Sequence, residues 1–299
     1  MSKLAFVFPG QGSQTVGMEA DLAETALGKE KLQQAEDILG WSVSQLCQQD
    51  EEKLSRTLYT QPCLYVIESI LVDLLIEEAG QLPQYVAGHS LGEYSALYAA
   101  RVFSFEAGLR LVQQRAKLMD TAGGGKMVAL MKFDRAQLES ALDKNEDVVL
   151  ANDNSPQQVV ISGTPEAVDR LLSEVKARRA TPLHVSGAFH SPLMTQVAQQ
   201  FKPVLEAVSF GEAIIPVLSN VNPQPTTDAT ELKNRLMEQM TGAVRWRETI
   251  LQLAAEGVSQ LIEVGPGNVL TGLCKRTCSD IELHNISRAA ECNLTLSLA

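Results

Sequence analysis

The chain has 299 residues, enough for one large domain or for one domain with a smaller insert. Its 45% apolar and 20% charged residues are typical of a soluble globular enzyme. The net charge of −11 argues against nucleic acid and anionic membrane surfaces as partners, and no apolar run approaches the length that a bilayer-spanning helix needs.

The first apolar run, Leu4 to Phe8, is stopped by Pro9-Gly10 and is too short for the core of a signal peptide. It predicts a buried strand, and we expect a cytoplasmic protein. Further along the chain, positions 30–79 are predicted to be mostly helical.

The next motif is GHSLG at Gly88 to Gly92, a match to G-x-S-x-G. An apolar strand, Tyr85 to Ala87, precedes it, and a helix-forming stretch, Glu93 to Ala100, follows it. This strand–turn–helix context is typical of a nucleophile elbow, with Ser90 exposed and the N–H of Leu91 free to stabilise an oxyanion. The alternative is a serine that only caps the helix.

A glycine triplet at 123–125 opens a segment with another pattern. Strands are predicted at 127–131, 148–152, 158–162 and 181–185, helices at 134–142 and 164–178, and a turn at 154–156. The order βαββαβ is that of the ferredoxin-like unit. We therefore expect a small ferredoxin-like subdomain, 125–187, inserted into a large α/β-hydrolase-like domain made of 1–124 and 188–299. A third strand of that domain, Gln260 to Val264, completes a pattern that predicts a mostly parallel sheet.

A nucleophilic serine needs a base, and four histidines are available. His190 lies in a glycine-containing loop that leads out of the insert, a good place to aim a base across a cleft. His89 adjoins Ser90 and is expected to leave the turn in another direction. His184 falls on a predicted strand, and His284 has no motif around it.

An acid that orients the histidine is not evident. The aspartates between the serine and the histidine stand in no motif, and most fall on predicted solvent faces or turns. Another acceptor, such as a carbonyl, would be needed. The aspartates are Asp120, Asp134, Asp143, Asp147, Asp153 and Asp169.

The five cysteines show neither C-x-x-C nor finger-like spacing to histidine, so we expect reduced, inert thiols and no metal site. They are Cys47, Cys63, Cys274, Cys278 and Cys292.

Four motifs occur in order, FPGQGSQ, GHSLGEYSAL, GAFHSPLM and VGPGNVLTGL. With them the chain resembles malonyl-CoA:acyl carrier protein transacylases over nearly its whole length. These fatty-acid-synthesis enzymes are related to polyketide-synthase acyltransferase domains. The resemblance implies ping-pong transfer of malonyl from its coenzyme A ester to the phosphopantetheine thiol of acyl carrier protein, through a serine ester and with no bound cofactor.

The resemblance also implies roles for individual residues. Ser90 matches the nucleophile and His190 its general base. The backbone N–H of Gln11, with that of Leu91, matches the oxyanion hole. Gln239 matches the residue that helps fix the histidine ring in place of the missing acid.

Arg115 matches the arginine that grips the free carboxylate of malonate. Its neighbours Arg110 and Lys117 would by themselves predict a solvated helix face. Asn154 matches an asparagine of the small domain that faces the cleft. Phe189 matches the aromatic residue of malonyl-selective enzymes, and its ring would crowd an α-methyl branch, so we expect malonyl to be preferred over methylmalonyl.

An acidic carrier protein would need a local basic patch on this acidic chain. Arg178-Arg179 and Lys275-Arg276 are the candidates, against ordinary surface charge. A trans-acting acyltransferase of a polyketide synthase is the nearest alternative function. A serine esterase and a non-catalytic acyl-CoA-binding protein are more distant ones. We expect a monomer.

Overall fold

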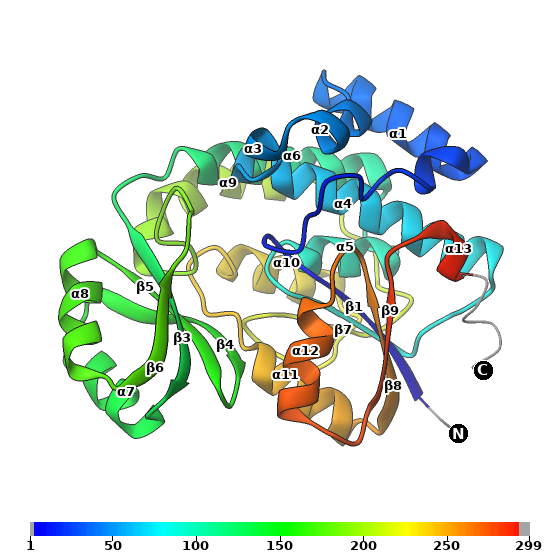
Figure 1. The fold of residues 1–299 in the computed structure, drawn as a ribbon. Coiled ribbons are helices and arrows are strands. Elements are labelled where there is room, and N and C mark those ends of the chain that lie inside the picture. The colour runs from blue at the N-terminus through cyan, green and yellow to red at the C-terminus, as the bar shows by residue number, and fades with distance from the viewer. Residues whose placement is uncertain (1–2, 293–299) are drawn as a thin grey trace.

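The computed structural model describes residues 3–292, which build two separate sheets (Figure 1). All pairs in the larger sheet are parallel, in the order β7-β2-β1-β8-β9. The prediction of an α/β fold with a mostly parallel sheet is therefore confirmed. The strands of this sheet are β1 (Lys3–Phe8), β2 (Tyr85–Gly88), β7 (Val217–Leu218), β8 (Val258–Val264) and β9 (Glu282–Ile286).

Helices cover both faces of the parallel sheet. Along β1, Phe6 and Phe8 enter the core shared with α1, α4, α5 and α6, whereas Ala5 and Val7 enter a second core under α11 and α12. Burial on both faces explains why this strand reads as a continuous apolar run. The helices around this sheet are α1 (Ala26–Leu39), α2 (Val43–Gln49), α3 (Glu51–Leu54), α4 (Thr57–Asp73), α5 (Gly92–Ala99), α6 (Phe105–Asp120), α9 (Thr195–Glu206), α10 (Ala229–Glu238), α11 (Trp246–Ala255), α12 (Val269–Thr277) and α13 (Ala289–Cys292).

Helix α4 corrects one expectation from the sequence. Together with the π-helical turn that follows it, it forms a 21-residue helix, Thr57–Glu77, which by length and composition could cross a membrane. In the fold, 89% of its apolar window is buried, and it packs against α1, α5 and α6. It is the central helix of the core.

The second sheet is antiparallel and has the order β4-β5-β3-β6 (Figure 1, green). Helices α7 and α8 cover one of its faces, and the predicted βαββαβ order is confirmed. The division into 1–124 with 188–299, and 125–187, stays our proposal. The elements are β3 (Lys126–Phe133), α7 (Arg135–Leu142), β4 (Val148–Ser155), β5 (Gln158–Gly163), α8 (Pro165–Glu174) and β6 (Ala177–Pro182).

Three elements of this unit have boundaries that differ from prediction. Helix α8 ends at Glu174, and β6 is Ala177–Pro182 where 181–185 was expected. The strand lies at the sheet edge with mostly exposed side chains, so it lacks the apolar alternation that marks a strand. Strand β4 continues through Ser155, into the turn expected at 154–156, because Ser155 still pairs with Gln158 of β5.

The two sheets meet at strand β4. Asn152 forms an isolated parallel bridge with Val244, in the segment just before α11. The carboxyl ends of β1 and β2 face this junction, which is where open α/β sheets bind their ligands.

Candidate active site

Ser90 sits on a strained bend between β2 and α5. Its φ of 52° lies in the left-handed region, which few residues other than glycine adopt. A Cβ on Gly88 would lie 1.9 Å from the backbone carbon of Gly92, and a Cβ on Gly92 would lie 2.1 Å from the carbonyl oxygen of Phe8. Only glycine fits at either position, so the chain can turn sharply and expose the serine hydroxyl.

His190 meets Ser90 directly, although 100 residues separate them. Its Nε2 lies 2.8 Å from Ser90 Oγ, and its Nδ1 lies 2.9 Å from the backbone carbonyl of Gln239. Because a carbonyl only accepts, Nδ1 carries the proton and Nε2 is left to accept from the serine hydroxyl. A carbonyl thus orients the ring in place of an acid.

Burial, together with the positive charge of Arg115, lowers the pKa of His190 to about 3. The imidazole is therefore neutral at pH 7 and available as a base. His190 itself adopts φ of 56°. Two residues in the left-handed region thus face each other across one hydrogen bond, an arrangement that concentrates at functional sites.

Arg115 is fully buried, and the solvated face suggested by its neighbours is wrong. It projects from α6, and its Nη2 donates to Ser90 Oγ at 3.2 Å and to Gln239 Oε1 at 3.0 Å. Its Nη1 donates to Gln61 Oε1 at 2.7 Å. Burial lowers the pKa of Arg115 from its ordinary value. The guanidinium is held by neutral acceptors beside the serine, which leaves its charge without a carboxylate hydrogen-bonded to it within residues 3–292.

Gln11 and Leu91 line the same cavity as Ser90, from the loops after β1 and β2. Within residues 3–292 neither backbone N–H has a hydrogen-bond partner. The Gln11 side chain is tied to Thr57 Oγ1 at 3.2 Å, which holds this residue at the cavity wall. Both N–H groups are thus available to an added acceptor.

The cavity has a volume of about 210 Å³ and lies between the two sheets. Its walls come from the loops after β1, β2 and β6, from β3, β4 and β5, and from α12. Phe189 and Asn154 both line it, as expected. Asn154 Oδ1 accepts from His89 Nε2 at 2.8 Å, so His89 turns away from Ser90 Oγ as predicted. The remaining histidines, His184 and His284, do not line this cavity.

Sequence reasoning missed Asn220, which clamps the bend. Its Oδ1 accepts the N–H of Ser90 at 2.7 Å, and its Nδ2 donates to the carbonyl of Gly88 at 2.5 Å. It lies two residues after β7, the neighbour of β2, so only a prediction of that strand could have indicated its position. The strand has only two residues, Val217–Leu218, too few to give a periodic signal.

Glu93 was also missed. Its Oε2 accepts from the backbone N–H of Asn220 at 3.0 Å and from Gln239 Nε2 at 2.8 Å. Gln239 Nε2 donates in addition to the carbonyl of Ser90 at 2.9 Å. Burial raises the pKa of Glu93. This carboxylate joins the clamp on the serine to the residue that orients the histidine.

Within residues 3–292 none of the five cysteines forms a disulfide, and none lines the cavity. Burial raises the pKa of the Cys274 thiol to about 12, as expected for an inert thiol. Within the described part of the chain, no group of three or more histidine, cysteine, aspartate and glutamate side chains could hold a metal ion.

Comparison with known proteins agrees with the four motifs. A family model described as "Acyl transferase domain" matches residues 5–294. The malonyl CoA-acyl carrier protein transacylase of Synechocystis sp. is 61% identical over 97% of this chain and 99% of its own length. Its crystal structure superimposes with a TM-score of 0.96, covering 98% of this chain and 99% of that one.

Two further relatives belong to polyketide systems. The polyketide biosynthesis malonyl CoA-acyl carrier protein transacylase PksC of Bacillus subtilis is 41% identical over 93% of this chain and 98% of its own length. A type II polyketide acyl-carrier protein has been solved in complex with its malonyl-transacylase, PlMCAT. The matched chain of that structure is 38% identical with a TM-score of 0.94, and the match covers 100% of this chain and 100% of that chain. The resemblance predicted from the motifs is confirmed, and the chain belongs to the acyl transferase domain family.

Proposed function

We propose that this enzyme transfers the malonyl group of malonyl-CoA to the phosphopantetheine thiol of acyl carrier protein, by a ping-pong mechanism through a malonyl ester on Ser90. The observation that carries the proposal is the position of Ser90 Oγ. It lies 2.8 Å from the Nε2 of His190 and 3.2 Å from the Nη2 of Arg115. The nucleophilic oxygen is therefore in contact with both a neutral base and a buried cation that is suited to binding a carboxylate.

Acyl transfer then follows from these contacts. His190 Nε2 takes the hydroxyl proton as Ser90 Oγ attacks the thioester carbonyl, and the backbone N–H groups of Gln11 and Leu91 receive the oxyanion. Each such donor is worth about 2.7–4 kcal/mol in the transition state. The imidazolium returns its proton to the leaving thiolate of coenzyme A. The carrier thiol repeats the steps in reverse on the ester carbonyl.

Arg115 supplies selectivity for a dicarboxylic acyl group. A guanidinium pairs with a carboxylate through two parallel hydrogen bonds. A plain acetyl group would leave this buried charge unpaired. Phe189, buried in the cavity wall, would crowd an α-methyl branch, which favours malonyl over methylmalonyl by about 1–3 kcal/mol.

The two basic pairs named from the sequence lie on elements next to the cavity wall, and they are the proposed docking site for carrier protein. Arg178 and Arg179 are exposed on β6, just before a loop that lines the cavity. Lys275 and Arg276 are exposed on α12, which also lines it. Two exposed positive pairs suit an acidic carrier despite the net charge of −11.

The carrier is proposed to be that of fatty acid biosynthesis. Identity is 61% to the Synechocystis enzyme and 41% to the polyketide enzyme of Bacillus subtilis, so the trans-acting polyketide function is the second candidate. We further propose that the enzyme acts in the cytoplasm as a monomer without nucleic-acid or membrane partners, and that it needs no bound cofactor.

A two-step transfer experiment tests the proposal. Enzyme loaded with radiolabelled malonyl-CoA is separated from coenzyme A and then mixed with holo-acyl carrier protein, with apo-carrier as the control. Transfer of label to the holo-carrier alone is the expected result. Release of label to water at the same rate with or without carrier would instead identify a serine esterase, and no loading would identify a binding protein.

A further inference from the structure

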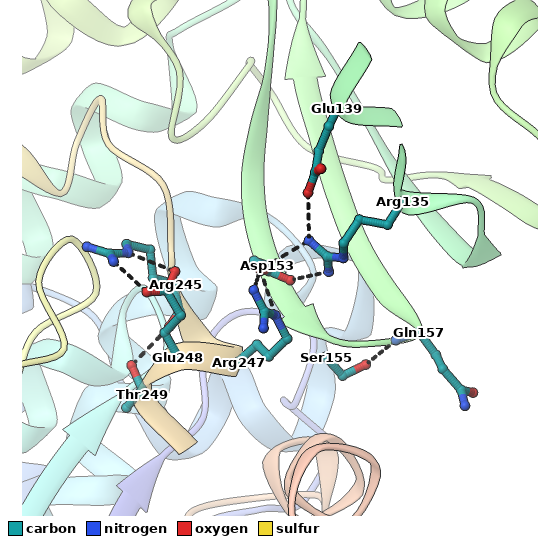
Figure 2. Close-up of polar contacts among 9 residues, drawn as sticks. All are labelled: Arg135, Glu139, Asp153, Ser155, Gln157, Arg245, Arg247, Glu248 and Thr249. Carbon is teal, nitrogen blue, oxygen red and sulfur yellow. Dashed lines mark hydrogen bonds and ion pairs between the residues drawn. The ribbon is translucent and has the colours of Figure 1, made fainter. Parts of the chain in front are cut away.

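Asp153 lies between two arginines from different parts of the fold (Figure 2). It belongs to β4 and is 5% exposed. Its Oδ1 is 2.9 Å from Arg135 Nη2, at the start of α7. Its Oδ2 is 2.9 Å from both Nε and Nη2 of Arg247, in α11. One buried carboxylate thus ties the antiparallel sheet to a helix that packs on the parallel sheet. This site was not expected, because Asp153 was placed with the aspartates of solvent faces and turns.

The strand on either side of Asp153 faces the cavity. Asn152 and Asn154 both line it, and Asn154 binds the His89 ring. Backbone hydrogen bonds add to the tie, since the N–H of Asp153 donates to the carbonyl of Val244 at 2.9 Å and the N–H of Val244 donates to the carbonyl of Ala151 at 2.8 Å. We call the two ion pairs and these backbone hydrogen bonds the Asp153 clamp. The Asp153 clamp therefore fixes the depth at which the side chains of Asn152 and Asn154 enter the substrate cavity.

Neither Ser90 nor His190 is hydrogen-bonded to the Asp153 clamp itself. Ser90 is held by Asn220, and His190 by the carbonyl of Gln239. Both contacts lie within the part built on the parallel sheet. Loosening the Asp153 clamp would move the cavity wall formed by β4 while leaving the reacting atoms in place. A change in substrate affinity without a change in the chemical step is the signature of such an arrangement.

We propose that Asp153 is a positioning residue for substrate binding: its ion pairs with Arg135 and Arg247 set the two cavity asparagines for the coenzyme A ester. The inference rests on the proposed function, because the substrate is that of the proposed transfer. A carboxylate held by two arginines from separate elements fixes both position and orientation, which a single exposed ion pair does not.

The test measures the loading half-reaction with malonyl-CoA in the full chain. The variants are Asp153→Asn, Arg247→Gln and the double variant. Glu139→Gln is the matched control, because Glu139 pairs with the same Arg135 at 3.8 Å but is 62% exposed and does not contact Asp153. We expect each single variant to raise the half-saturating malonyl-CoA concentration about tenfold, with the maximal loading rate within about twofold of wild type.

The double variant is expected to match the more impaired single variant, since both changes break the same Asp153–Arg247 ion pair. The control is expected to behave as wild type. Lowered melting temperatures with unchanged half-saturation would overturn the proposal, as would a fall in the maximal rate or additive effects in the double variant. If Asp153→Asn does not fold, Arg247→Gln decides alone, because that side chain is 28% exposed and Asp153 keeps its pair with Arg135.

Wild-type loading separates the two proposals. Wild-type enzyme that acquires no malonyl group would contradict the proposed function. Wild-type enzyme that loads normally, beside variants with unchanged half-saturation, would contradict only the role of Asp153.

Discussion

Replacing Arg115 with alanine should convert a malonyl-selective site into one that no longer distinguishes malonyl from acetyl. The guanidinium has two terminal nitrogens, of which Nη2 lies 3.2 Å from Ser90 Oγ. Nη1 donates one hydrogen to Gln61, and Nη2 donates one to Gln239 and the other to Ser90 Oγ. A malonyl carboxylate can use the remaining Nη1 hydrogen. It can also use the Nη2 hydrogen that Ser90 gives up on becoming an ester.

The size of the effect follows from those two hydrogen bonds. Each hydrogen bond to a charged group contributes about 1.5–3 kcal/mol. One of the two replaces an existing bond to the serine hydroxyl, so the pair should contribute about 3–4 kcal/mol, or about 10²- to 10³-fold in kcat/KM for loading. Acetyl-CoA has no carboxylate to lose, and removal of the buried unpaired charge should leave its loading equal or faster.

Stopped loading reactions with each ester, followed by intact-protein mass, give both values of kcat/KM. Acetyl loading also reports whether Ser90 and His190 remain in place in the variant. Arg110→Ala is the matched control, because Arg110 is exposed on the same helix. Malonyl loading within about threefold of wild type, or equal losses for both esters, would refute the role assigned to Arg115.

Three further predictions address the serine, the histidine and the bend. Because the pKa of His190 is lowered to about 3, its neutral form persists at all higher pH, so the loading rate should stay flat between about pH 5 and 8; a rate that halves near pH 6.5 would show a histidine of ordinary pKa. Asn220→Ala removes the clamp on Ser90 and should lower the maximal loading rate about 10- to 100-fold with little change in half-saturation, measured by the same loading assay; an unchanged rate would show that the bend holds itself. Gly92→Ala places a Cβ 2.1 Å from the carbonyl oxygen of Phe8 and should cost more than about 3 kcal/mol in unfolding free energy by denaturant titration, whereas Gly123→Ala, with nothing within 4 Å, should cost less than about 1 kcal/mol; equal costs would contradict the steric argument.

The parts of the site that carry local motifs were predictable from sequence. The strand and bend around Ser90, and the loop of His190, have short-range signals in glycine placement and apolar runs. The family resemblance then supplied Gln11, Gln239 and Arg115. The burial of Arg115 could not be read from its helix, because the charged residues beside it in sequence point to a different face.

The parts that depend on long-range contacts were not predictable. Asn220 follows a two-residue strand, and Asp153 is buried only because Arg135 and Arg247 reach it from two other elements. The edge strand β6 carries exposed arginines and so reads as the end of a helix. In each case the tertiary partner, absent from the local pattern, decides the structure.

The central claim is that Ser90 Oγ carries the malonyl group, and the most direct measurement is the mass of the intact enzyme after brief incubation with malonyl-CoA, followed by peptide mapping. One malonyl adduct on the peptide that contains Ser90, and none in the Ser90→Ala variant, is the expected result. An adduct on another residue, or one that survives in Ser90→Ala, would contradict the account.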